Sequence, residues 1–251
     1  MEKQENIQRL SHSYWSQRAE EFSQLRMQDY ESPLYPAFKE FLRKNMPETG
    51  APLKALDAGC GAGFFSMLLS ELGCEVTGVD FSQDMLRQAA KNARDTGHDR
   101  ISFLHMDIQN MGFSDEAFDF IVTRNVTWVL PDASRAYEEM MRVLRPGGVL
   151  LNMDSNYGKA FNESDARGET PSHPSQSLEQ LKMRNFIARD LEITRTDRPE
   201  WDMVKLWKEG AASVCCYRDL EKLLGIGRWN HQYTKPSASS RAVMFAVAAW
   251  K

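Results

Sequence analysis

Residues 57–63 read Asp-Ala-Gly-Cys-Gly-Ala-Gly, and this stretch carries most of the information about the fold. The short run Leu53–Leu56 precedes it, and residues 64–69 follow it with helical spacing. This order indicates a strand, a glycine turn and a helix. Glycine accepts positive φ and, having no Cβ, lets a ligand approach the backbone. The first turn of the helix adds free N–H groups and a positive dipole end, so the stretch predicts a ligand-binding turn.

The spacing of the glycines narrows the kind of ligand. Turns rich in glycine also bind NAD, FAD and nucleotides, so the turn alone is a weak signal. Here the glycines follow the pattern G-x-G-x-G rather than the dinucleotide pattern G-x-G-x-x-G, and Asp57 closes the strand just before them. The stretch therefore favours a ligand other than a dinucleotide.

Further along the chain, other segments repeat the pattern of a strand followed by a short turn. Asp80 closes the run of residues 74–79, about 20 residues past the glycines, where α/β nucleotide sites bind ribose hydroxyls with a carboxylate. The remaining segments are residues 101–108, ending in Asp107-Ile108, residues 118–128, ending in Arg124-Asn-Val-Thr-Trp128, and residues 145–153, opening with Arg145-Pro-Gly-Gly148. With these motifs in this order, residues 53–154 resemble the class I S-adenosylmethionine-dependent methyltransferases, particularly the small-molecule enzymes of methyltransferase type 11.

This resemblance implies a Rossmann-like, doubly wound α/β fold with a seven-stranded sheet whose last strand is antiparallel. It implies S-adenosyl-L-methionine as the cofactor and S-adenosyl-L-homocysteine as the product. Within the resemblance, Asp80 binds the ribose, Phe81 lies against the adenine, and Asp107 binds the adenine edge. The residues that it assigns to the cofactor are Tyr14, Asp57, Gly59, Cys60, Gly61, Gly63, Asp80, Phe81, Met85, Asp107, Ile108, Arg124, Asn125 and Trp128. Trp128 could instead pack in the core.

The length of 251 residues and the 42% of hydrophobic residues suit one α/β core with additional parts. We expect a single methyltransferase domain over residues 1–251. Its parts are an N-terminal helical lid (1–45), the cofactor-binding core (53–154), a substrate-cap insertion after the fifth strand (155–210), polar at first and then helical, and a C-terminal helix and strands (211–251). Strands alternating with helices predict a parallel sheet covered on both faces.

The lid is expected from one helix that carries Tyr14, Trp15, Arg18 and Phe22. Tyr14, Arg18 and Phe22 recur at i, i+4 and i+8, which places two aromatic side chains and a cation on one helical face. This pattern is similar to the N-terminal helix that many small-molecule methyltransferases fold over the cofactor. An amphipathic helix docked on the edge of the sheet is the alternative.

The catalytic residue stays unknown at this stage, because methyl transfer needs a general base only when the acceptor atom is protonated. Weak candidates are Tyr14, Tyr157 and His173. Tyr157 and His173 belong to the insertion, which we expect at the carboxyl ends of the strands, where ligands bind in open α/β sheets. His173 lies next to a proline in an expected surface loop, where a solvated histidine is the simpler interpretation.

The net charge of −4 disfavours a nucleic acid as partner, because nucleic-acid affinity depends largely on neutralised phosphates. Residues 124–128 also lack the Asn/Asp-Pro-Pro-Tyr motif of exocyclic amine methylation. We expect a small-molecule substrate. No apolar run approaches the roughly 20 residues of a membrane span, and the N-terminus is unlike a signal peptide. These patterns predict a cytoplasmic protein without a membrane association, and leave monomer and homodimer open.

The four cysteines show neither C-x-x-C spacing nor a disulfide framework, so we expect reduced thiols. Cys60 and Cys74 fit as small packing residues. The adjacent Cys215 and Cys216 raise the possibility of a soft metalloid site. Two neighbouring cysteines on a helix would face different directions and supply too few ligands, so no metal is expected.

Three functions stay open on the sequence alone. The first is methyl transfer to a small molecule by in-line displacement. The second is a cofactor-binding regulatory protein without turnover. The third is a nicotinamide-dependent oxidoreductase, which the glycine spacing and Asp107 oppose.

Overall fold

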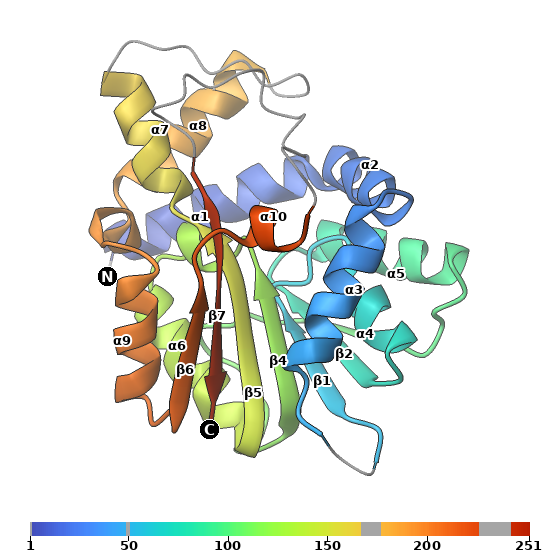
Figure 1. Ribbon diagram of the computed structural model, residues 1–251. Coiled ribbons are helices and arrows are strands. Elements are labelled where there is room, and N and C mark those ends of the chain that lie inside the picture. The colour runs from blue at the N-terminus through green and yellow to red at the C-terminus, as the bar shows by residue number, and fades with distance from the viewer. Residues whose placement is uncertain (1, 49–50, 167–176, 226–241) are drawn as a thin grey trace.

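The computed structural model describes residues 2–48, 51–166, 177–225 and 242–251 (Figure 1). Its strands form one seven-stranded sheet in the order β3-β2-β1-β4-β5-β7-β6. Their bounds are β1 Lys54–Ala58, β2 Glu75–Asp80, β3 Ser102–His105, β4 Phe118–Arg124, β5 Leu144–Ser155, β6 Ser213–Tyr217 and β7 Met244–Trp250. Strands β1 to β5 pair in parallel, and β7 is antiparallel to both β5 and β6. The predicted fold class is confirmed, including the antiparallel last strand.

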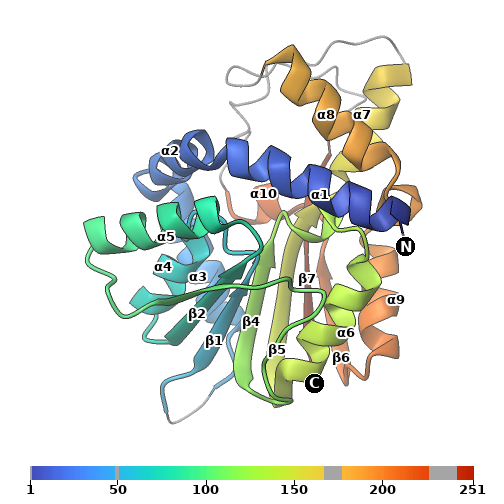
Figure 2. The same cartoon turned by 180° about the vertical axis from the view of Figure 1, so that it is seen from behind.

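Helices cover both faces of the sheet (Figures 1 and 2). Their bounds are α1 Glu2–Gln17, α2 Ala19–Tyr30, α3 Leu34–Asn45, α4 Phe64–Glu71, α5 Gln83–Asp95, α6 Ala133–Val143, α7 Tyr157–Ala166, α8 Leu178–Arg189, α9 Glu200–Lys208 and α10 Leu220–Leu223, with short 3-10 helices η1 Thr127–Val129 and η2 Glu192–Arg195. None of the helices in these described ranges combines the length and the apolar character needed to cross a membrane.

The two faces bury separate apolar clusters. On one face, Phe38 of α3 and Leu68 of α4 pack with Phe120 of β4. On the other face, Tyr137 and Met140 of α6 pack with Leu150 of β5 and Leu206 of α9, as the periodicity of residues 137–144 predicts. A parallel sheet buried on both sides is the expected consequence of helical crossovers.

The local signals around two helices behave as the sequence indicates. Ser82 caps α5, because its hydroxyl accepts a hydrogen bond from the Met85 N–H at 3.3 Å. Helix α6 ends at Val143, just before the segment 145–148. That segment opens β5 rather than standing as a separate loop, and the register between β4 and β5 shifts across it.

The N-terminal segment differs from the single helix that the sequence predicts. Helix α1 ends at Gln17, and Arg18 has φ −100° and ψ 0°, so α2 begins in a new direction at Ala19. The prediction of one straight helical face is therefore wrong, because the chain bends at Arg18. Helices α1 and α2 lie across the carboxyl ends of the strands, with α7 and α8 beyond them (Figures 1 and 2).

The insertion also begins differently from the expectation of a polar start. Helix α7 starts at Tyr157, directly after β5. Its second residue, Gly158, lies so close to Thr194 of η2 that a Cβ would come within 2.2 Å of the Thr194 hydroxyl oxygen. The first turn of the insertion is therefore packed against its later part.

A buried ion cluster ties the insertion to the sheet. Arg198 pairs with Asp202 of α9 at 2.6 Å and with Asp154 of β5 at 3.3 Å, and all three side chains are fully buried. Arg198 also donates to the Thr127 hydroxyl in η1 at 2.6 Å. Tyr137 of α6 donates to Asp202 at 2.6 Å. One guanidinium therefore joins β5, η1, α6 and α9.

Removing this guanidinium should destabilise the protein strongly. Arg198→Ala leaves two buried carboxylates without a counter-charge, a change that costs about 3–5 kcal/mol of unfolding free energy in comparable pairs. Urea denaturation followed by circular dichroism measures the loss. Arg218→Ala is the matched control, because Arg218 pairs with Glu200 of the same insertion on the exposed surface, and it should leave the midpoint unchanged. Equal midpoints for both variants would contradict the structural importance of the cluster.

Candidate functional site

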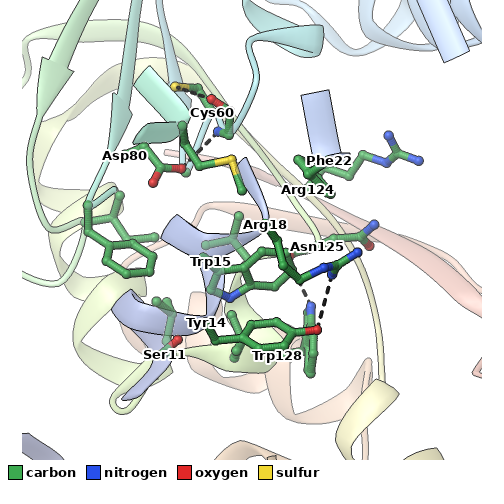
Figure 3. A pocket seen from close by; sticks show the side chains of 18 of the residues that line it. Ser11, Tyr14, Trp15, Arg18, Phe22, Cys60, Asp80, Arg124, Asn125 and Trp128 are labelled. Atoms are coloured by element: carbon green, nitrogen blue, oxygen red, sulfur yellow. Dashed lines mark hydrogen bonds between the residues drawn. The ribbon is translucent and has the colours of Figure 1, made fainter. Parts of the chain in front are cut away.

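One cavity lies at the carboxyl ends of the parallel strands, and each of the five neighbouring strands contributes to it. The contributions begin with Gly59 after β1, Asp80 at the end of β2, Asp107 after β3, Arg124 at the end of β4 and Tyr157 after β5. Figure 3 shows how side chains from these strand ends and from α1 and α2 point into the same space. This is the place where ligands bind in open α/β sheets.

The glycine loop is held against the end of β2 by its backbone. Gly59 N–H and Cys60 N–H donate to the Val79 carbonyl at 2.8 and 2.9 Å. Gly61 N–H donates to Asp80 Oδ2 at 2.9 Å. Gly61 has φ +52°, and a Cβ there would lie 3.2 Å from the Phe22 ring of α2. The loop is therefore fixed on one side and closely covered on the other.

Two buried carboxyl groups stand beside this loop. Asp80 accepts from Gly61 N–H and, through Oδ1, from Ser82 N–H at 2.9 Å. Asp57 accepts from the Ser66 hydroxyl at 2.6 Å. Burial raises the pKa of Asp57 to about 7 and the pKa of Asp80 to about 6. Both carboxyl groups therefore titrate near neutral pH, as functional carboxyls often do.

Asp107 lies at the more open end of the cavity. Gln8 of α1 donates to its Oδ2 at 2.6 Å, and Gln109 N–H donates to its Oδ1 at 2.9 Å. Phe81, Met85 and Ile108 supply apolar lining. This end therefore combines a carboxylate acceptor with an apolar wall, which suits a heterocycle with an exocyclic amino group.

The turn after β4 presents a strained polar residue to the cavity. Asn125 has φ +55°, a conformation that side-chain-bearing residues rarely adopt. Its carbonyl accepts from Trp128 Nε1 at 3.0 Å. Its side-chain Oδ1 is buried and has no hydrogen-bond partner in the part of the chain that the structure describes. A buried acceptor at a cavity wall suits a ligand that donates a hydrogen bond.

Trp128 is fixed on both sides. Its backbone N–H donates to Asp154 Oδ2 at 3.0 Å, so the buried ion cluster sets its position. Its ring contacts Tyr157 and Phe161 of α7 at centroid distances of 5.2 and 5.8 Å. Trp128 therefore packs in the core, where it is only 6% exposed, and also lines the cavity.

Helices α1 and α2 close the opposite wall. Tyr14, Trp15 and Phe22 form edge-to-face ring contacts in sequence, at 5.2 and 5.7 Å. Arg18 is buried and donates to the Tyr14 hydroxyl at 3.2 Å (Figure 3). Although the helix bends at Arg18, all four side chains line the cavity.

The structure brings the cofactor residues predicted from the sequence to this cavity with one exception. Gly63 does not line it, because its Cα faces Ala89 of α5, where a Cβ would lie at 3.2 Å. Tyr157 is part of the lining. His173 lies outside the described residues. Lining residues that the sequence analysis missed include Arg26, Phe161 and Arg184. Arg26 stands four residues after Phe22 and could have been found from helical spacing, whereas Phe161 and Arg184 required the tertiary packing of α7 and α8.

The cysteines stand apart from ligand chemistry. Burial raises the pKa of the Cys60 thiol well above its usual range, which suits a packing residue. Cys215 and Cys216 lie on strand β6 and not on a helix, and successive strand residues point to opposite faces. Over the described residues there is no group of three or more histidine, cysteine or acidic side chains that could hold a metal ion.

Comparisons with known proteins agree with this geometry. Residues 56–152 match the family described as "Methyltransferase domain". A demethylmenaquinone methyltransferase of Bacillus velezensis is 32% identical over 111 residues, which are 43% of this chain and 48% of that protein. The match therefore spans about half of that relative's length. A malonyl-[acyl-carrier protein] O-methyltransferase of Pectobacterium atrosepticum is 29% identical over 202 residues, 78% of this chain and 73% of the relative.

Solved structures share the fold over more of the chain. A Thermotoga maritima protein described as a SAM-dependent methyltransferase and possible histamine N-methyltransferase has a TM-score of 0.62 at 16% identity, covering 96% of this chain and 99% of its own. Phosphoethanolamine N-methyltransferase 2 of Haemonchus contortus, solved with S-adenosyl-L-methionine, has a TM-score of 0.58 at 17% identity, covering 85% and 52%. The family match confirms the predicted resemblance over residues 56–152, and the solved structures confirm the fold.

Proposed function

Because residues 56–152 match the methyltransferase-domain family, we propose that the protein is a class I S-adenosylmethionine-dependent methyltransferase that transfers a methyl group from S-adenosylmethionine to a small-molecule acceptor. The relatives are named for acceptors as different as a demethylmenaquinone and a malonyl group on acyl carrier protein. Their names therefore favour the reaction type over any single substrate.

One observation carries the proposal. The glycine loop, the buried Asp80, the more open Asp107 and Asn125 line one cavity, and the buried Oδ1 of Asn125 has no partner among the described residues. Asp80 would accept from the ribose hydroxyls and Asp107 from the adenine amino group. Asn125 Oδ1 would accept from the amino group of the methionine part, which donates hydrogen bonds. These donor and acceptor types fit S-adenosylmethionine.

We further propose that Asp57, Gly59, Cys60 and Gly61 shape the bed of the cofactor. Phe81, Met85 and Ile108 would flank the adenine, and Tyr14 and Trp128 would enclose the methionine end. Gly63 would act indirectly, by its φ of +86° at the start of α4.

Bound S-adenosylmethionine supplies a methyl group on a positively charged sulfur, which an acceptor atom displaces in line. The protein's own contribution is to hold the acceptor at attack distance and exclude water, which can lower the barrier by several kcal/mol. The aromatic residues Tyr14, Trp15, Trp128 and Tyr157 line the cavity and would provide that exclusion. Tyr14 or Tyr157 would serve as base only for an acceptor that is protonated at working pH.

Turnover on an acceptor library tests the proposed reaction. Purified protein with S-adenosylmethionine is incubated with thiols, amines, phenols and carboxylic acids, and release of S-adenosylhomocysteine is measured. We expect release with at least one class and none without an acceptor. Binding of S-adenosylmethionine without release for any class would instead support a regulatory protein.

The glycine loop gives a first prediction. Gly61→Val should abolish binding of S-adenosylhomocysteine, because the side chain would enter the cavity beside Phe22. Gly73→Val is the matched control: Gly73 has a similarly positive φ of +84° but no atom within 4 Å of a Cβ. Both variants place a valine at a positive φ. Calorimetry that finds normal affinity in folded Gly61→Val would contradict the assignment of the loop.

Asp80 gives a second prediction, on pH. Ribose hydroxyls donate to the ionised carboxylate, and its pKa of about 6 places its protonation just below neutral pH. Affinity for S-adenosylhomocysteine should therefore fall as the pH falls through 6, by about tenfold between pH 7 and pH 5. Asp80→Asn should weaken binding at least about tenfold at pH 7, since a charged hydrogen bond is worth about 1.5–3 kcal/mol.

The exposed Asp84→Asn on α5 is the matched control and should bind as the wild type does. The Asp57→Asn variant separates the effect of the second buried carboxyl group from that of Asp80, because the pKa of Asp57 is about 7 and its titration falls in the same pH range. An affinity of wild-type protein that does not change between pH 5 and pH 7 would contradict the role of Asp80.

The N-terminal helices give a third prediction, because we propose that they form a lid over the bound cofactor. Hydrogen exchange of residues 8–25 should slow when S-adenosylhomocysteine binds, since lids belong to the less stable parts of a fold. Helix α9 lines no part of the cavity and serves as the internal control. Deletion of the first 28 residues should abolish turnover. Unchanged exchange together with a fully active truncation would show that the helices are structural only.

A further inference from the structure

The cavity is unusually rich in guanidinium groups. Arg18, Arg26, Arg124 and Arg184 all line it. Arg18 pairs with Glu21, and Arg184 donates to Asn185 and lies over the Phe161 ring. Arg124, at the end of β4, is different from these.

Arg124 is surrounded by aromatic rings. Its guanidinium carbon lies 4.8, 5.6 and 5.8 Å from the ring centroids of Phe38, Phe65 and Phe64. In the described part of the chain it forms neither a hydrogen bond nor an ion pair, and its Nε is buried. Ring faces attract a cation but leave its N–H donors unsatisfied. The buried Nε donor lacks a partner among the described residues, so an acceptor from outside the chain would satisfy it.

The charges that face Arg124 make this end of the cavity positive. The charged groups beside Arg124 are Arg26 and Asp29, and the neutral Tyr157 phenol also lies nearby. Arg26 also lines the cavity and pairs with Asp29 at 2.9 Å, so the one carboxylate in the group is already matched. Burial, followed by the charge of Arg26, lowers the pKa of Arg124 to about 10, which still leaves it protonated at neutral pH. Two guanidinium groups therefore lie near a single carboxylate, which only Arg26 pairs with.

The carboxylates that we assign to the cofactor do not balance this charge. Within the described residues, no ion pair joins Arg124 to Asp57, Asp80 or Asp107. S-adenosylmethionine itself carries a sulfonium and an ammonium group against one carboxylate, so its binding adds a net positive charge. The arginine charges and the positive charge of the cofactor would therefore both favour an anionic partner in this cavity. The nearby wall of Trp128, Tyr157 and Phe161 is aromatic, so the same partner would also bury apolar surface.

We propose that the methyl acceptor carries a carboxylate or phosphate group that binds to Arg124, assisted by Arg26, and an apolar body that packs against Trp128, Tyr157 and Phe161. This inference rests on the proposed methyl transfer and names its acceptor class. It also changes the role of Arg124, which the family resemblance assigns to the cofactor. Because Arg26 belongs to α2, the lid would contribute part of the acceptor site.

Anion binding can be tested without turnover. Protein saturated with S-adenosylhomocysteine is titrated by calorimetry with phenylacetate, phenyl phosphate and the neutral phenylacetamide. We expect at least one anion to bind at least about tenfold more tightly than the amide, about 1.4 kcal/mol. Arg124→Gln should reduce this preference to within about twofold and leave the affinity for S-adenosylhomocysteine unchanged.

Two further variants complete the test. Arg87→Gln, an exposed arginine on α5 paired with Asp84, is the matched control and should retain the full preference. Arg26→Gln should weaken anion binding by a smaller factor than Arg124→Gln, and it keeps the proposal testable if Arg124→Gln does not fold.

Two results would overturn the proposal. One is wild-type protein that binds the anions no better than the amide. The other is Arg124→Gln that loses affinity for S-adenosylhomocysteine while the anion preference persists, which would return Arg124 to the cofactor. If wild-type protein binds no S-adenosylhomocysteine, the proposed function fails instead. The same titrations with the anions and the amide, carried out without S-adenosylhomocysteine, then decide separately whether Arg124 binds anions.

Discussion

The hydrogen bonds between the glycine loop and the end of β2 are the constraint on which the site depends. Gly59 and Cys60 donate to the Val79 carbonyl, and Gly61 donates to Asp80. These bonds require the loop backbone to approach β2 closely, and Gly61 must hold a positive φ beneath the Phe22 ring to do so. Once the loop is fixed, the parallel pairing of β1 with β2 and β4 brings Asp80 and Asn125 to the same edge. The ligand-binding surface is thus a consequence of strand pairing and of glycine geometry together.

The cavity divides its charges between two sets of elements. The carboxylates Asp57, Asp80 and Asp107 and the cation Arg124 come from the ends of the strands, whereas Arg26 and Arg184 come from the helices around the sheet, α2 and α8. Trp128 links the strands to the surrounding helices, because its backbone N–H donates to Asp154 of β5 and its ring contacts Tyr157 of α7. The buried Arg198 holds Asp154 of β5 and Asp202 of α9 together, which ties α9 to the sheet beside the cavity. The division fits a fold in which the core binds a common cofactor and the added helices select the acceptor.

The sequence predicted the parts of the fold that depend on local chemistry. The glycine turn after β1, Asp80 at the end of β2 and Asp107 just after β3 follow from spacing and residue type, and the structure has them where the sequence places them. Features that depend on distant contacts were missed or mistaken. The bend at Arg18 interrupts a perfect helical spacing, strand β6 carries a cysteine pair expected on a helix, and the Arg198 cluster joins residues far apart in the chain. The sequence identified Arg124 as a site residue. Only the structure shows that its buried Nε has no hydrogen-bond partner among the described residues.

The central claim is that this cavity binds S-adenosylmethionine and not a nicotinamide cofactor. Parallel calorimetric titrations of the full chain with S-adenosylhomocysteine and with NAD at pH 7.5 would test it most directly. The account predicts one site with a dissociation constant on the order of micromolar for S-adenosylhomocysteine, about −8 kcal/mol, and no measurable heat with NAD. Saturable binding of NAD with none of S-adenosylhomocysteine would contradict it.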